Sequence, residues 1–103
     1  MAITDTITLA MFRDYFYRSE QYKHNFSYEG LESLYNYLWE YSENTEEDIE
    51  MDIVAFSCEF SEFYSIEEFQ EDYGEEYKTI EDIEEQTTVI KIEDKTSFII
   101  RQF

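Results

Sequence analysis

Apolar residues near the start of the chain recur at the spacing of a helix. Leu9, Phe12 and Phe16 fall on one face of a segment that runs from residue 9 to about 19, and apolar positions three and four apart indicate an amphipathic helix. Residues 3–9 alternate between apolar and polar, as a short strand would. The pattern therefore leaves the start of this first helix open.

A second helical pattern covers residues 28 to about 42. Leu31, Leu34 and Leu38 form its apolar stripe, with polar residues on the other faces. The charged residues 43–48 follow as a connection. The sequence therefore predicts two helices before the middle of the chain.

The segment 49–60 has a different character, because it is rich in β-branched and aromatic residues. Val54, Phe56, Cys58 and Phe60 alternate along one face, and the opposite face is apolar as well. An apolar run of this kind predicts a central strand that is covered on both sides. Free cysteine is among the most buried residue types, so Cys58 is expected to be a buried, structural residue.

The last third of the chain contains four short elements. Two helices are predicted at 66–73 and at 80–85, and two strands at 88–92 and 98–103, joined by a turn at residues 93–96. The predicted order is helix, helix, strand, helix, helix, strand, strand. The fold class is therefore α+β, with a small, mostly antiparallel sheet of about three strands and three to four helices packed on it.

Hydroxyl residues precede each predicted helix and are suited to cap it. They are Thr8, Ser27, Ser65 and Thr79. Glu68 follows Ser65 at the capping-box spacing, at which the carboxylate bonds back to the start of the helix.

The composition is that of one folded domain spanning residues 1–103. Acid-rich chains that stay disordered are poor in aromatic residues, whereas 19% of this chain is Phe, Trp or Tyr. No apolar run approaches the ~18 residues of a membrane span, and the N-terminus lacks the order of a secretion signal. We expect a soluble, cytoplasmic protein that does not bind membranes.

Charge is distributed very unevenly along the chain. The formal net charge is −19, and residues 27–85 hold 21 acidic residues but a single base, Lys78. A surface that is only solvated usually mixes both signs, so the missing bases point to a partner with a positive surface. The candidate partner-binding residues are the clustered acids Glu46, Glu47, Asp48, Glu50, Glu67, Glu68, Glu71, Asp72, Glu75, Glu76, Glu81, Asp82, Glu84 and Glu85.

Catalytic and metal chemistry find little support in the sequence. An EF-hand loop starting at Asp72 would need glycine at position 77 and glutamate at position 83, where Tyr77 and Ile83 stand. One cysteine excludes an intrachain disulfide, and His24 is the only histidine. A pair of catalytic carboxylates of the glycosidase type remains an alternative. Such enzymes usually need a deep substrate cleft, however, which a chain of this size can hardly enclose. We predict a non-enzyme without cofactor or metal.

The acidic stretch can be compared with DNA. A duplex carries one negative charge per ~1.7 Å of its axis, so the net −20 of residues 27–85 corresponds to ~34 Å of duplex, near one helical turn. Carboxylates would take the place of phosphates opposite lysine and arginine. Reversal of Glu67, Glu68, Glu71 and Asp72 to lysine is then predicted to abolish inhibition of the DNA-binding partner while folding survives.

With few bases and many aromatics, this small acidic chain resembles the DNA-mimic inhibitors of phages and mobile elements, such as anti-CRISPR proteins, anti-restriction proteins and uracil-DNA glycosylase inhibitors. The resemblance covers the acidic half of the chain, and the stretch from Asn25 to Gly74 is similar in style to small phage proteins. The resemblance is one of charge and composition and carries over no site residue. It implies an inhibitor in the DNA-binding channel of a host defence nuclease, either a CRISPR effector or a restriction enzyme, with no direct binding of nucleic acid.

Two alternatives remain open at this point. One is an immunity protein or antitoxin that masks a basic toxin without imitating DNA. The other is an acidic enzyme or metal buffer, which tight and stoichiometric calcium binding would support.

Overall fold

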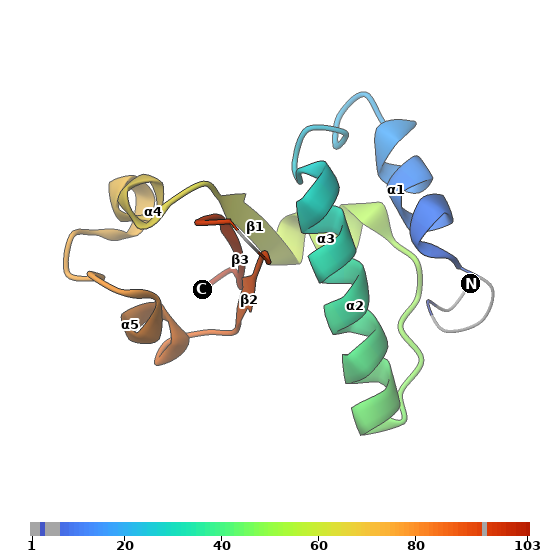
Figure 1. The fold of residues 1–103 in the computed structure, drawn as a ribbon. Coiled ribbons are helices and arrows are strands. Elements are labelled where there is room, and N and C mark those ends of the chain that lie inside the picture. Colours follow the sequence, from blue (N-terminus) through green and yellow to red (C-terminus); the bar gives the residue numbers. More distant parts are fainter. Residues whose placement is uncertain (1–2, 4–6, 94) are drawn as a thin grey trace.

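The computed structural model describes residues 3, 7–93 and 95–103. The α+β class is confirmed, with five helices and a three-stranded antiparallel sheet in the described part of the chain (Figure 1). In chain order the elements are α1 (Leu9–Tyr17), α2 (Tyr28–Thr45), α3 (Ile53–Glu59), β1 (Phe60–Phe63), α4 (Ile66–Tyr73), α5 (Ile80–Glu84), β2 (Val89–Lys91) and β3 (Phe98–Arg101).

The sheet has the order β1-β3-β2, so β3 is its central strand. The predicted C-terminal hairpin is confirmed, because β2 pairs antiparallel with β3 and Ile90 lies opposite Ile99. On the other side of β3, Phe63 of β1 lies opposite Phe98. Both neighbours of β3 are edge strands.

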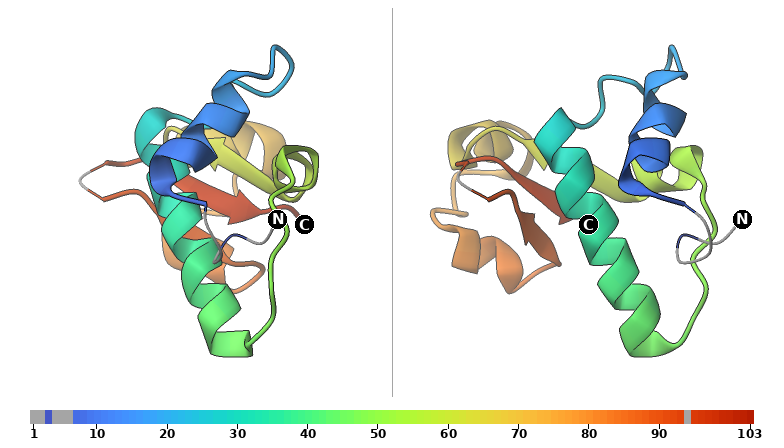
Figure 2. Two further views of the ribbon diagram at one scale, coloured as in Figure 1. Left: turned by 90° about the vertical axis from the view of Figure 1, so that its right-hand side faces the viewer. Right: turned by 45° about the vertical axis from the view of Figure 1, so that its right-hand side comes forward.

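Helices cover both faces of this sheet, as Figures 1 and 2 show. Alternate residues of β3 point to opposite faces. Ile99 belongs to a core with side chains of α1, α2 and α3, which we call the α1–α3 core. Phe98 and Ile100 belong to a second core with Phe69 of α4 and Ile83 of α5, the α4–α5 core. The sheet is thus the middle of three layers.

The prediction of one central strand over residues 49–60 is wrong. Only Phe60 of that segment lies in a strand, and residues 53–59 form α3. Asp52 begins this helix, because its carboxylate accepts hydrogen bonds from the backbone N–H groups of Val54 and Ala55 at 3.1 Å each. Only one side of the segment is covered, which suits an amphipathic helix on the surface of the core.

The expectation for Cys58 is wrong for the same reason. Helical geometry turns Phe56 into the α1–α3 core and leaves Cys58 exposed. The strand that is covered on both faces is β3, where Phe98, Ile99 and Ile100 are all buried. The run of consecutive apolar residues in β3 is typical of such a strand.

The ends of the other helices lie close to the predicted ones. Thr8 accepts a hydrogen bond from the Met11 N–H at 3.2 Å, so α1 begins at Leu9 as expected and ends two residues early. Helix α2 continues to Thr45, three residues beyond its predicted end. The alternative of a short strand over residues 3–9 is not formed by its described residues, because Ile3, Ile7 and Thr8 lie in no strand and Leu9 begins α1; residues 4–6 lie outside the described residues.

Candidate partner-binding surface

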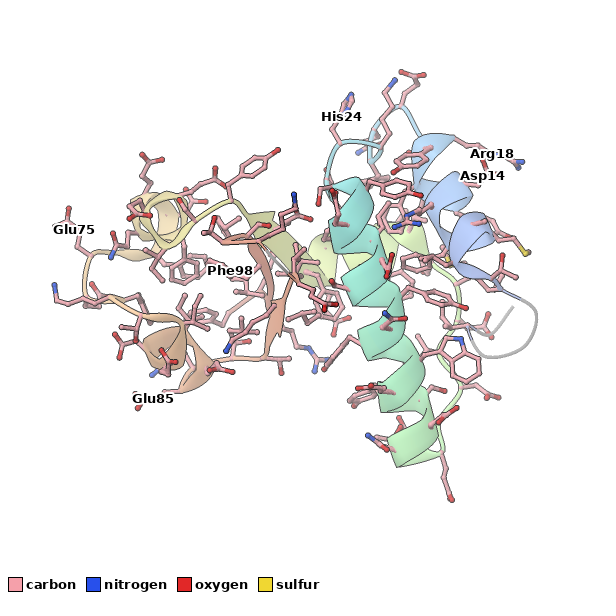
Figure 3. All side chains as sticks on the ribbon, viewed as in Figure 1. Asp14, Arg18, His24, Glu75, Glu85 and Phe98 are labelled. Carbon is pink, nitrogen blue, oxygen red and sulfur yellow. The ribbon has the colours of Figure 1, made fainter. Side chains whose placement is uncertain are left out.

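Ten of the fourteen candidate acids lie on one layer of the molecule. They come from α4, from α5 and the C-cap residue that follows it, and from the connection between these helices, and we call this set the α4–α5 acidic layer. Figure 3 shows Glu75 and Glu85 at its outer limits, pointing away from the sheet. Eight members are exposed and two are half-buried. The set comprises Glu67, Glu68, Glu71, Asp72, Glu75, Glu76, Glu81, Asp82, Glu84 and Glu85.

Buried aromatic residues hold α4 in place beneath these acids. Phe69 is fully buried and its ring stacks on Tyr73, with centroids 4.5 Å apart and planes inclined by 2°. Phe103 in turn stacks on Tyr73 at 4.7 Å. Because side chains three and four residues apart share one face of a helix, these aromatics cover the inner face of α4 and leave Glu67 and Glu71 on the outside.

Helix α5 is oriented in the same manner by a cap and a single buried residue. Thr79 and Asp82 form a complete capping box. Ile83 is fully buried in the α4–α5 core, so Glu81 and Glu84 face solvent. In the connection before α5, the Gln70 side chain donates a hydrogen bond from Nε2 to the Tyr77 carbonyl at 2.6 Å, which ties this segment to α4.

Two members of the layer have local structural roles. Asp82 accepts hydrogen bonds from the Lys78 and Thr79 N–H groups at 3.0 and 3.2 Å. Glu68 accepts a hydrogen bond from the Tyr64 N–H at 3.3 Å. The predicted capping box would instead use the N–H of the next residue, Ser65. The other eight acids make no side-chain hydrogen bond or ion pair within the described part of the chain, so they are available to a partner.

The ion pairs between described residues involve acids outside the α4–α5 acidic layer. Five pairs form between described residues, and none includes a member of the α4–α5 acidic layer. Lys78, the one base within the acidic layer, is exposed and forms no ion pair with a described residue. Within the described part of the chain, no ion pair therefore neutralises an acid of this layer. The pairs are Arg13–Glu32, Arg18–Asp14, Lys23–Glu20, Lys95–Glu29 and Arg101–Glu59.

The remaining four candidates, Glu46, Glu47, Asp48 and Glu50, lie elsewhere. They follow the C-terminal end of α2, and we call them the α2-end patch. In Figure 1 this end lies at the lower right, whereas α4 and α5 lie at the left. The structure thus divides the predicted set between two separate surfaces, of which the α4–α5 acidic layer is the larger.

Helix α2 ends in a strained residue of this patch. Glu46 has φ = 57°, in the left-handed region, where a side chain costs about 1 kcal/mol and glycine does not. A carboxylate at a helix C-terminus also opposes the helix dipole. We expect Glu46→Gly to raise the free energy of unfolding by about 0.5–1 kcal/mol, measured by urea denaturation. Glu47→Gly removes the same charge without a positive φ, and an equal gain there would refute the conformational explanation.

Glu62 of β1 is an acid that sequence reasoning missed. Its Oε1 accepts a hydrogen bond from the Ser27 N–H at 3.0 Å, at the start of α2. The approach needs Gly30, because a Cβ at that position would lie 1.9 Å from this oxygen. No local pattern indicates the contact, since its partners are 35 residues apart.

Other chemical sites find no support among the described residues. Those residues contain no group of three or more His, Cys, Asp or Glu side chains placed to hold a metal ion. Their helices include none that is long and apolar enough to cross a membrane. His24 and Cys58 are both exposed and lie in separate segments. No protein-family model, no curated protein and no solved structure matches this chain.

Proposed function

We propose that this protein is a DNA mimic that inhibits a nucleic-acid-binding protein. The α4–α5 acidic layer binds the positively charged DNA-binding channel of a host defence nuclease, a CRISPR effector or a restriction enzyme, and excludes DNA from it. The protein performs no catalysis in this role, and it needs neither cofactor nor metal.

The observation that carries the proposal is the uncompensated layer itself. Its ten carboxylates correspond to about 17 Å of duplex axis at one charge per ~1.7 Å. The molecule measures 41 × 32 × 24 Å along its principal axes, so a layer of this charge fits on one side of it. Lysine and arginine side chains that normally neutralise phosphates would meet carboxylates at a comparable charge density.

The acids of the α4–α5 acidic layer are poorly explained as residues that only keep the surface solvated. Acids in the first turns of α4 and α5 favour those helix ends through the dipole, but Glu71, Asp72 and Glu75 are not in a first turn. Like charges three or four residues apart destabilise a helix by a few tenths of a kcal/mol each. A basic partner would remove this cost on binding.

The proposal is tested by capture and competition. The immobilised protein is exposed to a bacterial lysate at 50 mM salt, and bound nucleases are eluted with a 20-base-pair duplex or with rising salt. We expect the duplex to displace the captured nuclease, and affinity to fall as salt rises, because charge complementarity drives the encounter. The purified nuclease should lose DNA binding when this protein is added.

The competing function, an immunity protein or antitoxin, gives a different result. A captured nuclease that is inhibited while its DNA binding stays undiminished would contradict mimicry and favour masking beside an active site.

A further inference from the structure

Strand β1 has an open edge. The Gln102 N–H donates to the Glu59 carbonyl at 2.8 Å, and hydrogen-bonded pairs alternate along an antiparallel ladder. Ser61 and Phe63 therefore direct their backbone groups to β3, whereas Phe60 and Glu62 direct theirs outward. The Phe60 N–H is taken by the Phe56 carbonyl of α3. The Phe60 carbonyl and both backbone groups of Glu62 have no backbone partner among the described residues, and they form the open edge.

A hollow lies along this edge and is bordered by acids. Its walls include Ser61 and Glu62 of β1, Ser57 of α3, and Glu68, Glu71 and Asp72 of α4. The carboxylates of α4 thus stand beside the unpaired backbone groups of β1. An extended chain in this hollow would find hydrogen-bonding groups on one side and negative charge on the other.

A side-chain hydroxyl in the same hollow also lacks a partner. The Ser57 Oγ is buried and forms no hydrogen bond within the described part of the chain. Buried polar groups in folded proteins are nearly always paired, and leaving one unpaired costs about 1–3 kcal/mol. This oxygen lies under the wall of the hollow and has less than 1 Å² of exposed area, so an occupant of the hollow would not contact it directly.

We propose that β1 binds an extended basic segment of the partner protein, which adds a fourth strand to the sheet. The backbone of the segment would pair with Phe60 and Glu62, and its lysine or arginine side chains would lie against Glu68, Glu71 and Asp72. Strand addition of this kind takes affinity from the backbone and specificity from alternate side chains. The inference rests on the proposed function, in that it assumes a basic protein partner.

Charge decides between this occupant and a second copy of the chain. Two copies would each bring a net charge of −19, and acidic side chains beside an edge strand are a known protection against pairing of like chains. A basic segment reverses the sign of that interaction. The acids beside β1 therefore repel the same chain and attract the proposed segment.

The edge can be tested with a defined probe. An eight-residue peptide that alternates lysine and valine is titrated into the full-length protein, and amide hydrogen exchange is followed by NMR. We expect exchange of the Glu62 N–H to slow at least tenfold at saturation. The same peptide with alternate backbone amides methylated keeps its charge but cannot pair, and should bind at least tenfold more weakly.

A pair of variants separates the backbone from the side chain. Glu62→Pro and Glu62→Ala both remove the carboxylate, but only proline removes the outward N–H, and proline is tolerated on an edge strand at such a position. We expect the proline variant to bind the peptide at least tenfold more weakly than the alanine variant. Equal affinities in variants with matching thermal unfolding would overturn the proposal.

Two further outcomes would also overturn the proposal. An unprotected Glu62 N–H at saturating peptide would overturn strand addition, whatever happens to the variants. Protection that rises with protein concentration in the absence of peptide would assign the edge to a second copy and overturn it as well. If the peptide experiments fail while DNA still displaces the captured nuclease, the proposed function stands. The DNA competition depends on the α4–α5 acidic layer and does not require strand addition at β1.

Discussion

Reversing the charge of four acids in the α4–α5 acidic layer is expected to weaken partner binding at least 100-fold. The change is Glu75→Lys, Glu76→Lys, Glu84→Lys and Glu85→Lys, at four exposed positions with no ion pair or side-chain hydrogen bond to another described residue. A 100-fold loss corresponds to about 2.7 kcal/mol. The measurement is the Kd for the captured nuclease at 150 mM salt.

The structure changes which residues suit this experiment. The set indicated by sequence, Glu67, Glu68, Glu71 and Asp72, includes a carboxylate that accepts the Tyr64 N–H. Two of its other members border the hollow beside β1. The new set avoids both complications, so a loss of binding would report on the charged layer itself.

A matched control uses the other acidic surface. Lysine at Glu43, Glu46, Glu47 and Asp48 changes the net charge by the same amount, but at the end of α2. The Debye length at 150 mM salt is about 8 Å, so charges on a different surface are largely screened from the partner. We expect the Kd to change by no more than about threefold. An equal loss in both variants would show that net charge matters and the α4–α5 acidic layer does not.

Truncating Phe69 is expected to have the largest effect on stability. Phe69 is fully buried and its ring contacts the rings of Phe63, Tyr73 and Phe98. Removal of a buried phenylalanine side chain typically costs 3–5 kcal/mol, against a total stability of about 5–15 kcal/mol for a domain. We expect Phe69→Ala to lower the free energy of unfolding by about 3–5 kcal/mol, measured by urea denaturation followed by circular dichroism.

Tyr64→Ala is the control for this effect. Tyr64 precedes α4 and is 71% exposed, so its side chain contributes little packing. Surface substitutions usually stay within about 0.5 kcal/mol. A loss below 1 kcal/mol in Phe69→Ala would contradict the role of this ring as the anchor of α4. Since α4 carries four acids of the layer, a destabilised α4 should also bind the partner more weakly.

Local chemistry decided much of this fold in advance. Leu31, Leu34 and Leu38 recur at helical spacing and all three are buried in α2. Thr79 and Asp82 form their capping box from residues three apart. The hairpin of β2 and β3 joins strands that are close in sequence. In each case the interacting groups are separated by only a few helical turns or one short loop. The pattern of residue types is therefore sufficient to predict these elements.

Local sequence does not determine the secondary structure of an apolar run that lacks a clear helical or strand period. The segment from Ile53 to Phe60 fits a buried strand or a helix equally well by composition. Asp52 caps the start of this segment, and the core covers only one of its sides. Both features favour a helix over a strand that is buried on both faces. The consequence for Cys58 is exposure in place of burial.

What the sequence by itself determined is the α+β class, most helix ends, the hairpin and the concentration of acid between residues 27 and 85. Tertiary structure alone decided that β3 is the central strand, that the candidate acids divide between the α4–α5 acidic layer and the α2-end patch, and that β1 keeps an open edge beside Glu71 and Asp72. The reason is physical. Helix periods and caps act between neighbours in sequence, whereas strand order and the grouping of charges depend on contacts such as Glu62 with Ser27, which only the packing of distant segments creates.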